Sequence, residues 1–208
     1  SDKNLYRLKR LNISKKITLL KGVATNLKFC EKILRRNINE IYYLAGDSSV
    51  IKSFDTPEIS LKSNTEGILN ILQILKRKKF KTKLFNAGSG QFYGDNKKNF
   101  YNIKSKIEPQ SPYGVSKAAA YWLIKIYREK YDLYCCTGIL FNHESPLRSK
   151  EFVTKKIVDT ALKIKKQKKL KLELGNVDIF RDWGWAPDYV KAIWLMMQRN
   201  KPRDFLIG

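Results

Sequence analysis

The sequence predicts an α/β protein built on a doubly wound parallel sheet. Short apolar runs alternate with longer amphipathic stretches along the chain of 208 residues. Leu133–Phe141 is apolar almost throughout, as expected for a parallel strand that helices cover on both faces. Such alternation is typical of linked β-α-β units. The length suits one domain with a substantial core, so we expect residues 1–208 to form a single unit.

Each expected element follows from its local pattern. Apolar runs predict strands at Ile17–Leu20, Glu40–Ala45, Lys83–Ala87, Leu133–Phe141, Leu170–Leu174 and Phe205–Ile207. Amphipathic periodicity predicts helices at Thr25–Arg36, Ser60–Arg77, Pro112–Tyr131, Phe152–Lys166 and Pro187–Arg199. In the second of these helices the expected inward residues are Ile68, Ile71, Leu72 and Leu75. In the third helix they are Ala119, Leu123, Ile126 and Tyr127.

One feature of a dinucleotide-binding fold is missing from the sequence. Such folds open with a strand, a glycine-rich turn and a helix whose N-terminus receives the pyrophosphate. No turn of this kind occurs, and the tight glycine cluster Gly88–Gly90 follows a later strand. We therefore expect the chain to be a fragment that lacks its first β-α-β unit. The alternative is that the protein never bound a dinucleotide.

The chain is strongly basic, with 42 Lys and Arg against 19 Asp and Glu and a formal net charge of +23. Such a charge can indicate a nucleic acid or an anionic membrane as partner. The lysines are spread along the chain without a nucleic-acid-binding motif, so we favour solvated helix faces and expect no nucleic-acid partner. The charge also suits a small polyanionic substrate such as a nucleoside diphosphate.

The cysteines and the first residues indicate the compartment. Cys30, Cys135 and Cys136 have no spacing typical of a metal site or a disulfide framework, so we expect buried, reduced thiols and no metal. The first residues, SDKNLYRLKR, are polar and basic, unlike a signal peptide. No apolar run reaches the roughly 20 residues that span a bilayer. We expect a cytoplasmic protein without a membrane partner.

The most informative motif is SPYGVSK, in which Tyr113 and Lys117 lie four residues apart. Residues at this spacing share one helix face, so a phenol and an ammonium can converge on one substrate atom. The unperturbed pKa of tyrosine is about 10, and a nearby Lys charge favours the phenolate. Ser89 ends a predicted strand upstream, and its hydroxyl could approach the same atom from the opposite side.

With this motif the chain resembles the extended short-chain dehydrogenase/reductase superfamily. Three more segments narrow the resemblance to the GDP-mannose 4,6-dehydratase family: GILFNHESPLR (Gly138–Arg148), FVTKKI (Phe152–Ile157) and LGNVDIFRDWGWAPDYVKAIWLMMQ (Leu174–Gln198). The resemblance covers the chain from about Ile17 to Gly208. It implies a Rossmann-like, NAD(P)-binding domain with part of a substrate-binding region at about 142–185. It also implies a homo-oligomer, either a dimer or a tetramer.

The resemblance assigns roles to individual residues. It implies NADP as the cofactor, contacted by Leu44, Ala45, Gly46, Ser48, Tyr113, Lys117, His143 and Arg148. It implies GDP-mannose as the substrate, contacted by Ser89, Asn142, Lys156 and Arg181. For Lys156 an ordinary solvated lysine is an equally good interpretation. Tyr113 would take the C4 hydroxyl proton during a transient oxidation, Ser89 would bond the reacting oxygen, and water would leave from C6.

Two positions depart from the family pattern. The family has a Glu two residues after the Ser/Thr, where it removes the C5 proton and protonates the leaving group at C6. This chain has Gln91, and a carboxamide cannot accept and return a proton at neutral pH. A Gly-Asp-Leu of the family is replaced by Gly22-Val23-Ala24, which weakens the case for cofactor binding.

These departures leave several functions open. The chain could be a GDP-mannose 4,6-dehydratase impaired in elimination, with Ser89, Gln91, Tyr113 and Lys117 at its catalytic position. It could instead be a related NADP-dependent sugar-nucleotide reductase or epimerase, which needs no C6 elimination. A third possibility is a catalytically degenerate paralogue that binds sugar nucleotide or serves as a partner subunit.

Overall fold

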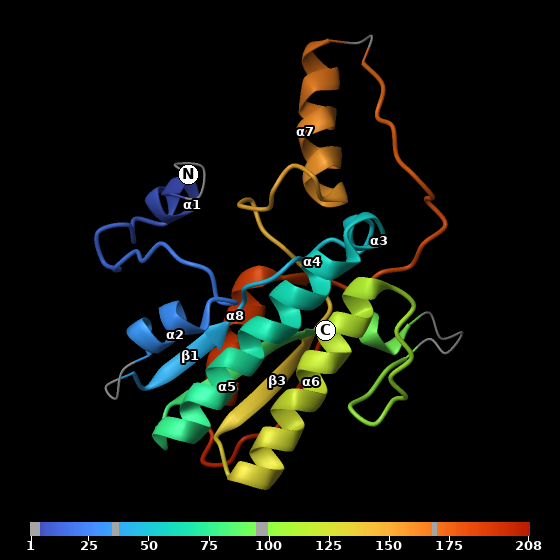
Figure 1. Ribbon diagram of the computed structural model, residues 1–208. Coiled ribbons are helices and arrows are strands. Elements are labelled where there is room, and N and C mark those ends of the chain that lie inside the picture. Colours follow the sequence, from blue (N-terminus) through green and yellow to red (C-terminus); the bar gives the residue numbers. More distant parts are fainter. Residues whose placement is uncertain (1–4, 35–37, 95–99, 168–169) are drawn as a thin grey trace.

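The computed structural model describes residues 5–34, 38–94, 100–167 and 170–208. Its centre is a four-stranded parallel sheet in the order β1-β2-β3-β6 (Figure 1). The strands are β1 (Glu40–Tyr43), β2 (Lys83–Ser89), β3 (Cys135–Leu140) and β6 (Phe205–Ile207). The predicted parallel α/β class is thus confirmed, and four of the predicted strands are present with slightly different ends.

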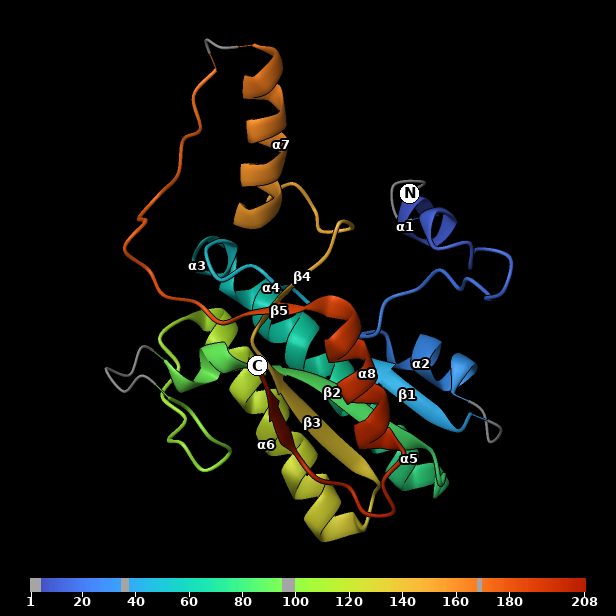
Figure 2. The ribbon, with the colours of Figure 1, turned by 180° about the vertical axis from the view of Figure 1, so that it is seen from behind.

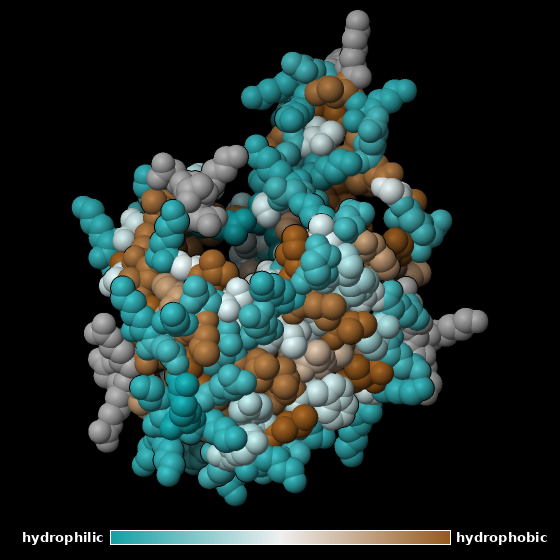
Figure 3. All heavy atoms as spheres, in the orientation of Figure 1, coloured by the Kyte–Doolittle hydropathy of each residue, from teal (hydrophilic) through white to brown (hydrophobic). Residues whose placement is uncertain are grey.

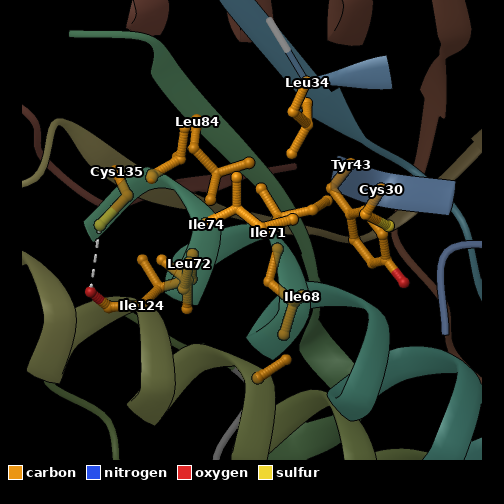
Figure 4. Packing of buried hydrophobic residues seen from close by; sticks show 12 residues of the cluster. Cys30, Leu34, Tyr43, Ile68, Ile71, Leu72, Ile74, Leu84, Ile124 and Cys135 are labelled. Atoms are coloured by element: carbon orange, nitrogen blue, oxygen red, sulfur yellow. Dashed lines mark hydrogen bonds between the residues drawn. The ribbon is translucent and has the colours of Figure 1, made fainter. Parts of the chain in front are cut away.

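Helices cover both faces of this sheet, as a doubly wound fold requires. On one face lie α2 (Leu27–Ile33), α5 (Gly67–Lys78) and α6 (Pro112–Tyr131), and on the other lies α8 (Ala186–Met197) (Figure 2). Successive strand residues face opposite layers. Leu84 and Cys135 pack in the α5–α6 layer, shown in Figure 4, whereas Phe85 and Cys136 pack against α8. This alternation accounts for the adjacent cysteine pair, whose thiols are free and buried as expected.

Helix α6 begins and ends where the sequence predicts. The Ser111 hydroxyl accepts a hydrogen bond from the Gly114 N–H at 3.0 Å, and Pro112 occupies the first turn. At the other end Asp132 is left-handed, with φ 51°. The predicted inward stripe is partly confirmed, because Leu123 and Tyr127 pack partly buried against the core, but Ile126 is 48% exposed. The fully buried face contains Tyr113, Ser116, Lys117, Ala120, Tyr121 and Ile124.

The predicted helix Ser60–Arg77 is interrupted. It consists of α4 (Pro57–Leu61), the π-helical turn η2 (Lys62–Glu66) and α5, and a short helix α3 (Lys52–Asp55) precedes them. The four predicted inward residues of α5 are all buried, at 0 to 6% exposure. A π-turn widens the helix by one residue and is frequent at functional sites, but hydrophobic periodicity does not reveal it.

Two predicted strands are absent. Residues Ile17–Leu20 and Leu170–Leu174 are irregular, and Leu19 and Leu20 are 57% and 64% exposed. A strand needs a neighbour for its hydrogen bonds, and neither run has one in the described part of the chain. The predicted helix Thr25–Arg36 is shortened to α2, and residues 35–36 lie outside the described residues. A further short helix, α1 (Leu5–Arg10), was not predicted.

The remaining elements lie beyond the carboxyl end of β3. Strands β4 (Asn142–Glu144) and β5 (Trp183–Trp185) pair in parallel, and α7 (Val153–Lys166) lies between them in sequence. Helix α7 stands away from the sheet in both ribbon views and carries mostly hydrophilic side chains in Figure 3. None of the described helices is long and apolar enough to cross a membrane. The described residues contain no group of His, Cys, Asp and Glu that could hold a metal ion.

Candidate active site

The predicted Ser, Tyr and Lys meet at the carboxyl end of β2. Ser89 ends the strand and caps the short helix η3 (Gly90–Tyr93) by accepting from the Gln91 N–H at 3.3 Å. Its hydroxyl also faces the Tyr113 phenol and lowers the pKa of that phenol. Gly114 allows the start of α6 to lie close to η3, because a Cβ at this position would lie 2.9 Å from the Gln91 carbonyl oxygen. Ser89 and Tyr113 can therefore address one substrate oxygen together.

The phenol of Tyr113 is buried, with 8% of the residue exposed. Burial raises its pKa above the usual value, and the hydrogen bond with Ser89 acts in the opposite direction. The Asp47 carboxylate raises this pKa further, and the Arg148 guanidinium lowers it. At neutral pH Tyr113 is thus a protonated phenol.

Lys117 lies one turn further along α6 and is equally buried. Its Nζ donates to the Ala87 carbonyl oxygen at 3.0 Å and lies 5.7 Å from the centroid of the Tyr113 ring. Burial lowers the pKa of the ammonium to about 8, while Asp47 acts to raise it. The sequence anticipated the shared face, but it did not indicate that burial would bring the Lys117 pKa close to neutrality.

A cavity of about 700 Å³ opens beside Ser89. The residues that line it include four of the predicted catalytic and substrate-binding residues: Ser89, Gln91, Asn142 and Arg181. Exposed aromatic rings of Phe100 and Phe180 form part of its wall. Asp182 contributes a carboxylate to the described lining residues, and Gln91 contributes a neutral carboxamide.

The small sheet of β4 and β5 joins two motifs that are far apart in the sequence. Asn142 pairs with Trp183 and His143 with Gly184, and the Asn142 side-chain amide donates to the Asp182 carbonyl oxygen at 3.1 Å. His143 Nδ1 lies 2.9 Å from the Phe141 carbonyl oxygen, and its ring stacks on Tyr189. The NHESP and RDWG segments therefore form one wall of the site.

A second cavity of about 330 Å³ gathers three predicted cofactor residues, Ser48, His143 and Arg148. The Arg148 guanidinium stacks on the Phe152 ring at 3.5 Å and pairs with Glu144 at 3.2 Å. Its Nε is buried without a well-aligned hydrogen bond. Such a polar, partly satisfied surface fits the amide and hydroxyl groups of a nicotinamide riboside. Arg7 also lines this cavity, and nothing in its sequence context had marked it.

The other predicted residues lie outside these two cavities. Leu44, Ala45 and Gly46 form the exposed loop after β1, and Gly46 has φ +127°, a conformation that favours glycine. Lys156 is exposed on α7 and lines neither cavity. Their assigned contacts remain predictions.

Sequence reasoning overlooked three polar residues behind the site: Asp47, Asn64 and Ser116. Asn64 Nδ2 donates to the Asp47 carbonyl oxygen at 3.2 Å and to the Ser116 hydroxyl at 3.1 Å. Asn64 lies in the π-turn, so the widened turn delivers its amide to α6. The available signal was the single acidic residue, Asp47, between Gly46 and Ser48 in the segment LAGDSSV.

The parallel sheet and the Ser, Tyr and Lys at its carboxyl end define an extended short-chain dehydrogenase/reductase. A sequence profile described as GDP-mannose 4,6 dehydratase matches residues 1–208. The chain is 39% identical over 210 residues to the GDP-mannose 4,6 dehydratase of Dictyostelium discoideum, covering 99% of this chain and 59% of that protein. The chain belongs to the GDP-mannose 4,6-dehydratase family, which confirms the resemblance.

Other relatives agree. GDP-mannose 4,6 dehydratase 1 of Arabidopsis thaliana is 41% identical over 174 residues, 82% of this chain and 48% of that protein. The chain thus spans between about half and three fifths of the length of these two relatives. Among solved structures, DesIV of Streptomyces venezuelae, a dTDP-glucose 4,6-dehydratase with NAD and TYD bound, has a TM-score of 0.87 at 20% identity, covering 98% of this chain and 62% of that one. RMD of Pseudomonas aeruginosa complexed with NADPH has a TM-score of 0.80 at 24% identity, covering 90% and 66%. These similarities confirm the Rossmann-like fold.

Proposed function

We propose that this protein acts on GDP-mannose as a GDP-mannose 4,6-dehydratase, a hydro-lyase that forms GDP-4-dehydro-6-deoxy-D-mannose. The observation that carries the proposal is the cavity in which Ser89, Gln91, Asn142 and Arg181 meet. Family membership supports the same substrate. Arg181 is exposed, and its guanidinium bonds only its neighbour's carbonyl among the described contacts, so it can turn to a diphosphate.

The cofactor we infer is NADP. Ser48, His143 and Arg148 would hold its nicotinamide end in the second cavity, and Tyr113 and Lys117 would contact the ribose. When bound, the nicotinamide supplies the hydride acceptor for C4 and the hydride donor for C6. NAD or NADPH in solved structures of the same fold supports a cofactor of this class. Lys156 would add charge toward the substrate phosphates.

The chain's own residues handle the protons. Ser89 and Tyr113 would hydrogen-bond the C4 oxygen, and Tyr113, once ionised to the phenolate, would accept the hydroxyl proton as the C4–H bond breaks. A protonated Lys117 favours the phenolate electrostatically, against the burial that raises the Tyr113 pKa. Gln91 can orient the C5–C6 region by hydrogen bonds, but it cannot remove the C5 proton. We therefore propose that oxidation at C4 is intact and that elimination is slow.

We further propose a cytoplasmic homo-oligomer, either a dimer or a tetramer. The three free cysteines support a reducing compartment. Because Gln91 departs from the family pattern, two other functions are the alternatives: a sugar-nucleotide reductase or epimerase, and a degenerate binding paralogue.

The deciding experiment incubates the protein with NADP⁺ and GDP-mannose deuterated at C4. We expect transient reduced cofactor and slow formation of the 4-keto-6-deoxy sugar. The Tyr113→Phe variant should lower the oxidation rate by about 10²- to 10⁴-fold, since it removes the general base. Oxidation without any loss of water would favour the reductase or epimerase, and absence of cofactor binding by the folded protein would favour the binding paralogue.

A further inference from the structure

Part of the cavity beside Ser89 is lined by packed aromatic rings. Tyr101 and Phe141 both line it, and their ring centroids lie 6.2 Å apart. The Tyr101 ring stacks on the buried ring of Tyr93, with a centroid distance of 5.1 Å and an interplanar angle of 12°. The Tyr101 hydroxyl donates to the Gly94 carbonyl oxygen at 2.7 Å. The cavity therefore has an aromatic surface that is already formed without a ligand.

Two further rings at the same cavity are almost completely exposed. Phe100 is 88% and Phe180 is 97% exposed, and both line the cavity. Single apolar side chains on a protein surface are common, but apolar groups that gather in a cavity with a few polar groups mark ligand sites. The two rings therefore indicate a ligand whose own apolar surface covers them.

A cation lies directly beside one of these rings. Arg181 follows Phe180 in the chain and lines the same cavity, and its Nη1 donates to the Phe180 carbonyl oxygen at 2.9 Å. A guanidinium suits the diphosphate of a sugar nucleotide. Aromatic rings next to basic side chains are the combination that holds bases and phosphates of nucleic-acid strands together. Phe180 and Arg181 therefore offer neighbouring contacts for a base and its phosphates.

The lining of the cavity also indicates where the base lies. Under the proposed function, the hexose of GDP-mannose lies at Ser89 and Gln91, and its diphosphate lies at Arg181. Most of the remaining lining side chains are apolar or aromatic: Phe100, Tyr101, Leu140, Phe141, Phe180 and Leu206. A planar base is the part of the ligand that can cover aromatic rings face to face.

We propose that Phe180 and Phe100 are substrate-binding residues whose rings stack on the guanine base of the sugar nucleotide. The proposal rests on the proposed function, which supplies the base and the order of the ligand's parts. Stacking of one base on an aromatic side chain corresponds to about 5- to 150-fold in the dissociation constant. Stacking does not contact the hydrogen-bonding edge of the base, so the two rings supply affinity and position.

The test measures binding by calorimetry, with GDP as the probe and NADP⁺ present. Phe180→Ala should raise the Kd of GDP by about 5- to 150-fold, whereas Phe180→Trp keeps an aromatic face and should stay close to the unchanged protein. Pyrophosphate carries the charges without the base, so its affinity should be the same in Phe180→Ala and in the unchanged protein. Phe100→Ala should show the same pattern as Phe180→Ala.

Phe54 on α3 provides the matched control. It is 61% exposed and lines neither of the two described cavities, so Phe54→Ala should leave the Kd of GDP unchanged. The side chains of Phe180 and Phe100 are too exposed to support the core, so their removal should leave the fold intact. An unchanged Kd of GDP in either alanine variant overturns the stacking role of that ring. An equal loss of pyrophosphate affinity also overturns it, since the ring would then act through Arg181.

Turnover separates this proposal from the proposed function. Where GDP-mannose is converted, Phe180→Ala should raise KM with little change in kcat, because stacking stabilises the bound substrate and the transition state alike. If GDP binding depends on the two rings but GDP-mannose is not converted, the proposed function fails and the base site stands. Conversion of GDP-mannose with an unchanged KM in Phe180→Ala overturns the base site alone. A folded protein that binds no GDP also overturns the base site.

Discussion

Gln91 is the residue at which the candidate site divides into two halves. Ser89 and Tyr113, the groups we propose for proton transfer at C4, lie together at the carboxyl end of β2, and Ser89 lowers the pKa of the Tyr113 phenol. Gln91 lies two residues further on, exposed to the cavity, with a neutral side chain where the proposed elimination would need a group that removes and returns a proton. Its carboxamide is close in size to a carboxylate, so this replacement can preserve substrate shape while removing one chemical step.

Restoring the carboxylate is the direct test of this division. We expect Gln91→Glu to raise the rate of 4-keto-6-deoxy sugar formation by about 10²-fold or more, since general acid–base groups contribute typically ~10²–10⁴. The rate of C4 oxidation, measured by hydrogen isotope exchange in the same samples, should change little. No gain in Gln91→Glu, or rapid turnover with Gln91 in place, would contradict this assignment of the missing base.

Asp182→Asn provides the matched control for that experiment, because Asp182 already places a carboxylate among the described residues that line the same cavity. Its main-chain oxygen is held by Asn142, and its Oδ2 faces the end of β6, 2.7 Å from the position of a Cβ on Gly208. The gain from Gln91→Glu should therefore persist in the double variant with Asp182→Asn.

At the scale of elements, the sequence predicted strands and helices correctly where residues close together in the sequence determine them. Ser111 and Pro112 mark the start of α6, and the β3 run is apolar because both faces are covered. The failures have tertiary causes. Ile17–Leu20 has strand composition but no neighbouring strand in the described residues, and the π-turn after α4 leaves the apolar pattern of α5 intact. Pairing partners and the rotation of a helix about its axis are set by contacts remote in sequence.

One such remote contact fixes the edge strand β6. Arg128 of α6 donates to both carboxylate oxygens of Asp204, at 2.8 and 2.5 Å, and Asp204 also accepts from the Thr137 N–H at 2.7 Å. Both side chains are mostly buried, at 16% and 7% exposure. This pair joins α6, β3 and the start of β6.

We expect Asp204→Ala to lower the free energy of unfolding by about 3–5 kcal/mol, because the mostly buried Arg128 charge loses its carboxylate and keeps only the Cys135 carbonyl oxygen. Urea unfolding followed by circular dichroism measures the loss. The less buried pair of Lys155 and Asp159 on α7, at 27% and 28% exposure, provides the comparison, and Asp159→Ala should cost less than about 1 kcal/mol. Similar losses in the two variants would contradict the role of burial.

At the scale of the whole molecule, the sequence predicted those parts of the candidate site that belong to recognisable motifs. Four predicted residues come from separate segments of the sequence, and the structure brings them together around the candidate site: Ser89, Tyr113, Asn142 and Arg181. The supporting unit of Asp47, Asn64 and Ser116 was not predicted, because these residues come from three segments and depend on a local helix distortion. A network of this kind becomes visible only when the chain is folded.

The net charge of +23 belongs to the whole molecule and permits a last prediction. Figure 3 shows hydrophilic side chains spread over the visible face with apolar patches between them. We therefore expect duplex DNA to bind weakly and without sequence preference, with its affinity falling by about 10³-fold or more between 50 and 200 mM salt. GDP-mannose carries few charges and should lose less than about tenfold over the same range, as measured by calorimetry. A submicromolar DNA complex that survives 200 mM salt would instead show that the lysines form a nucleic-acid site, and the sugar-nucleotide cavity would then explain only part of the protein's activity.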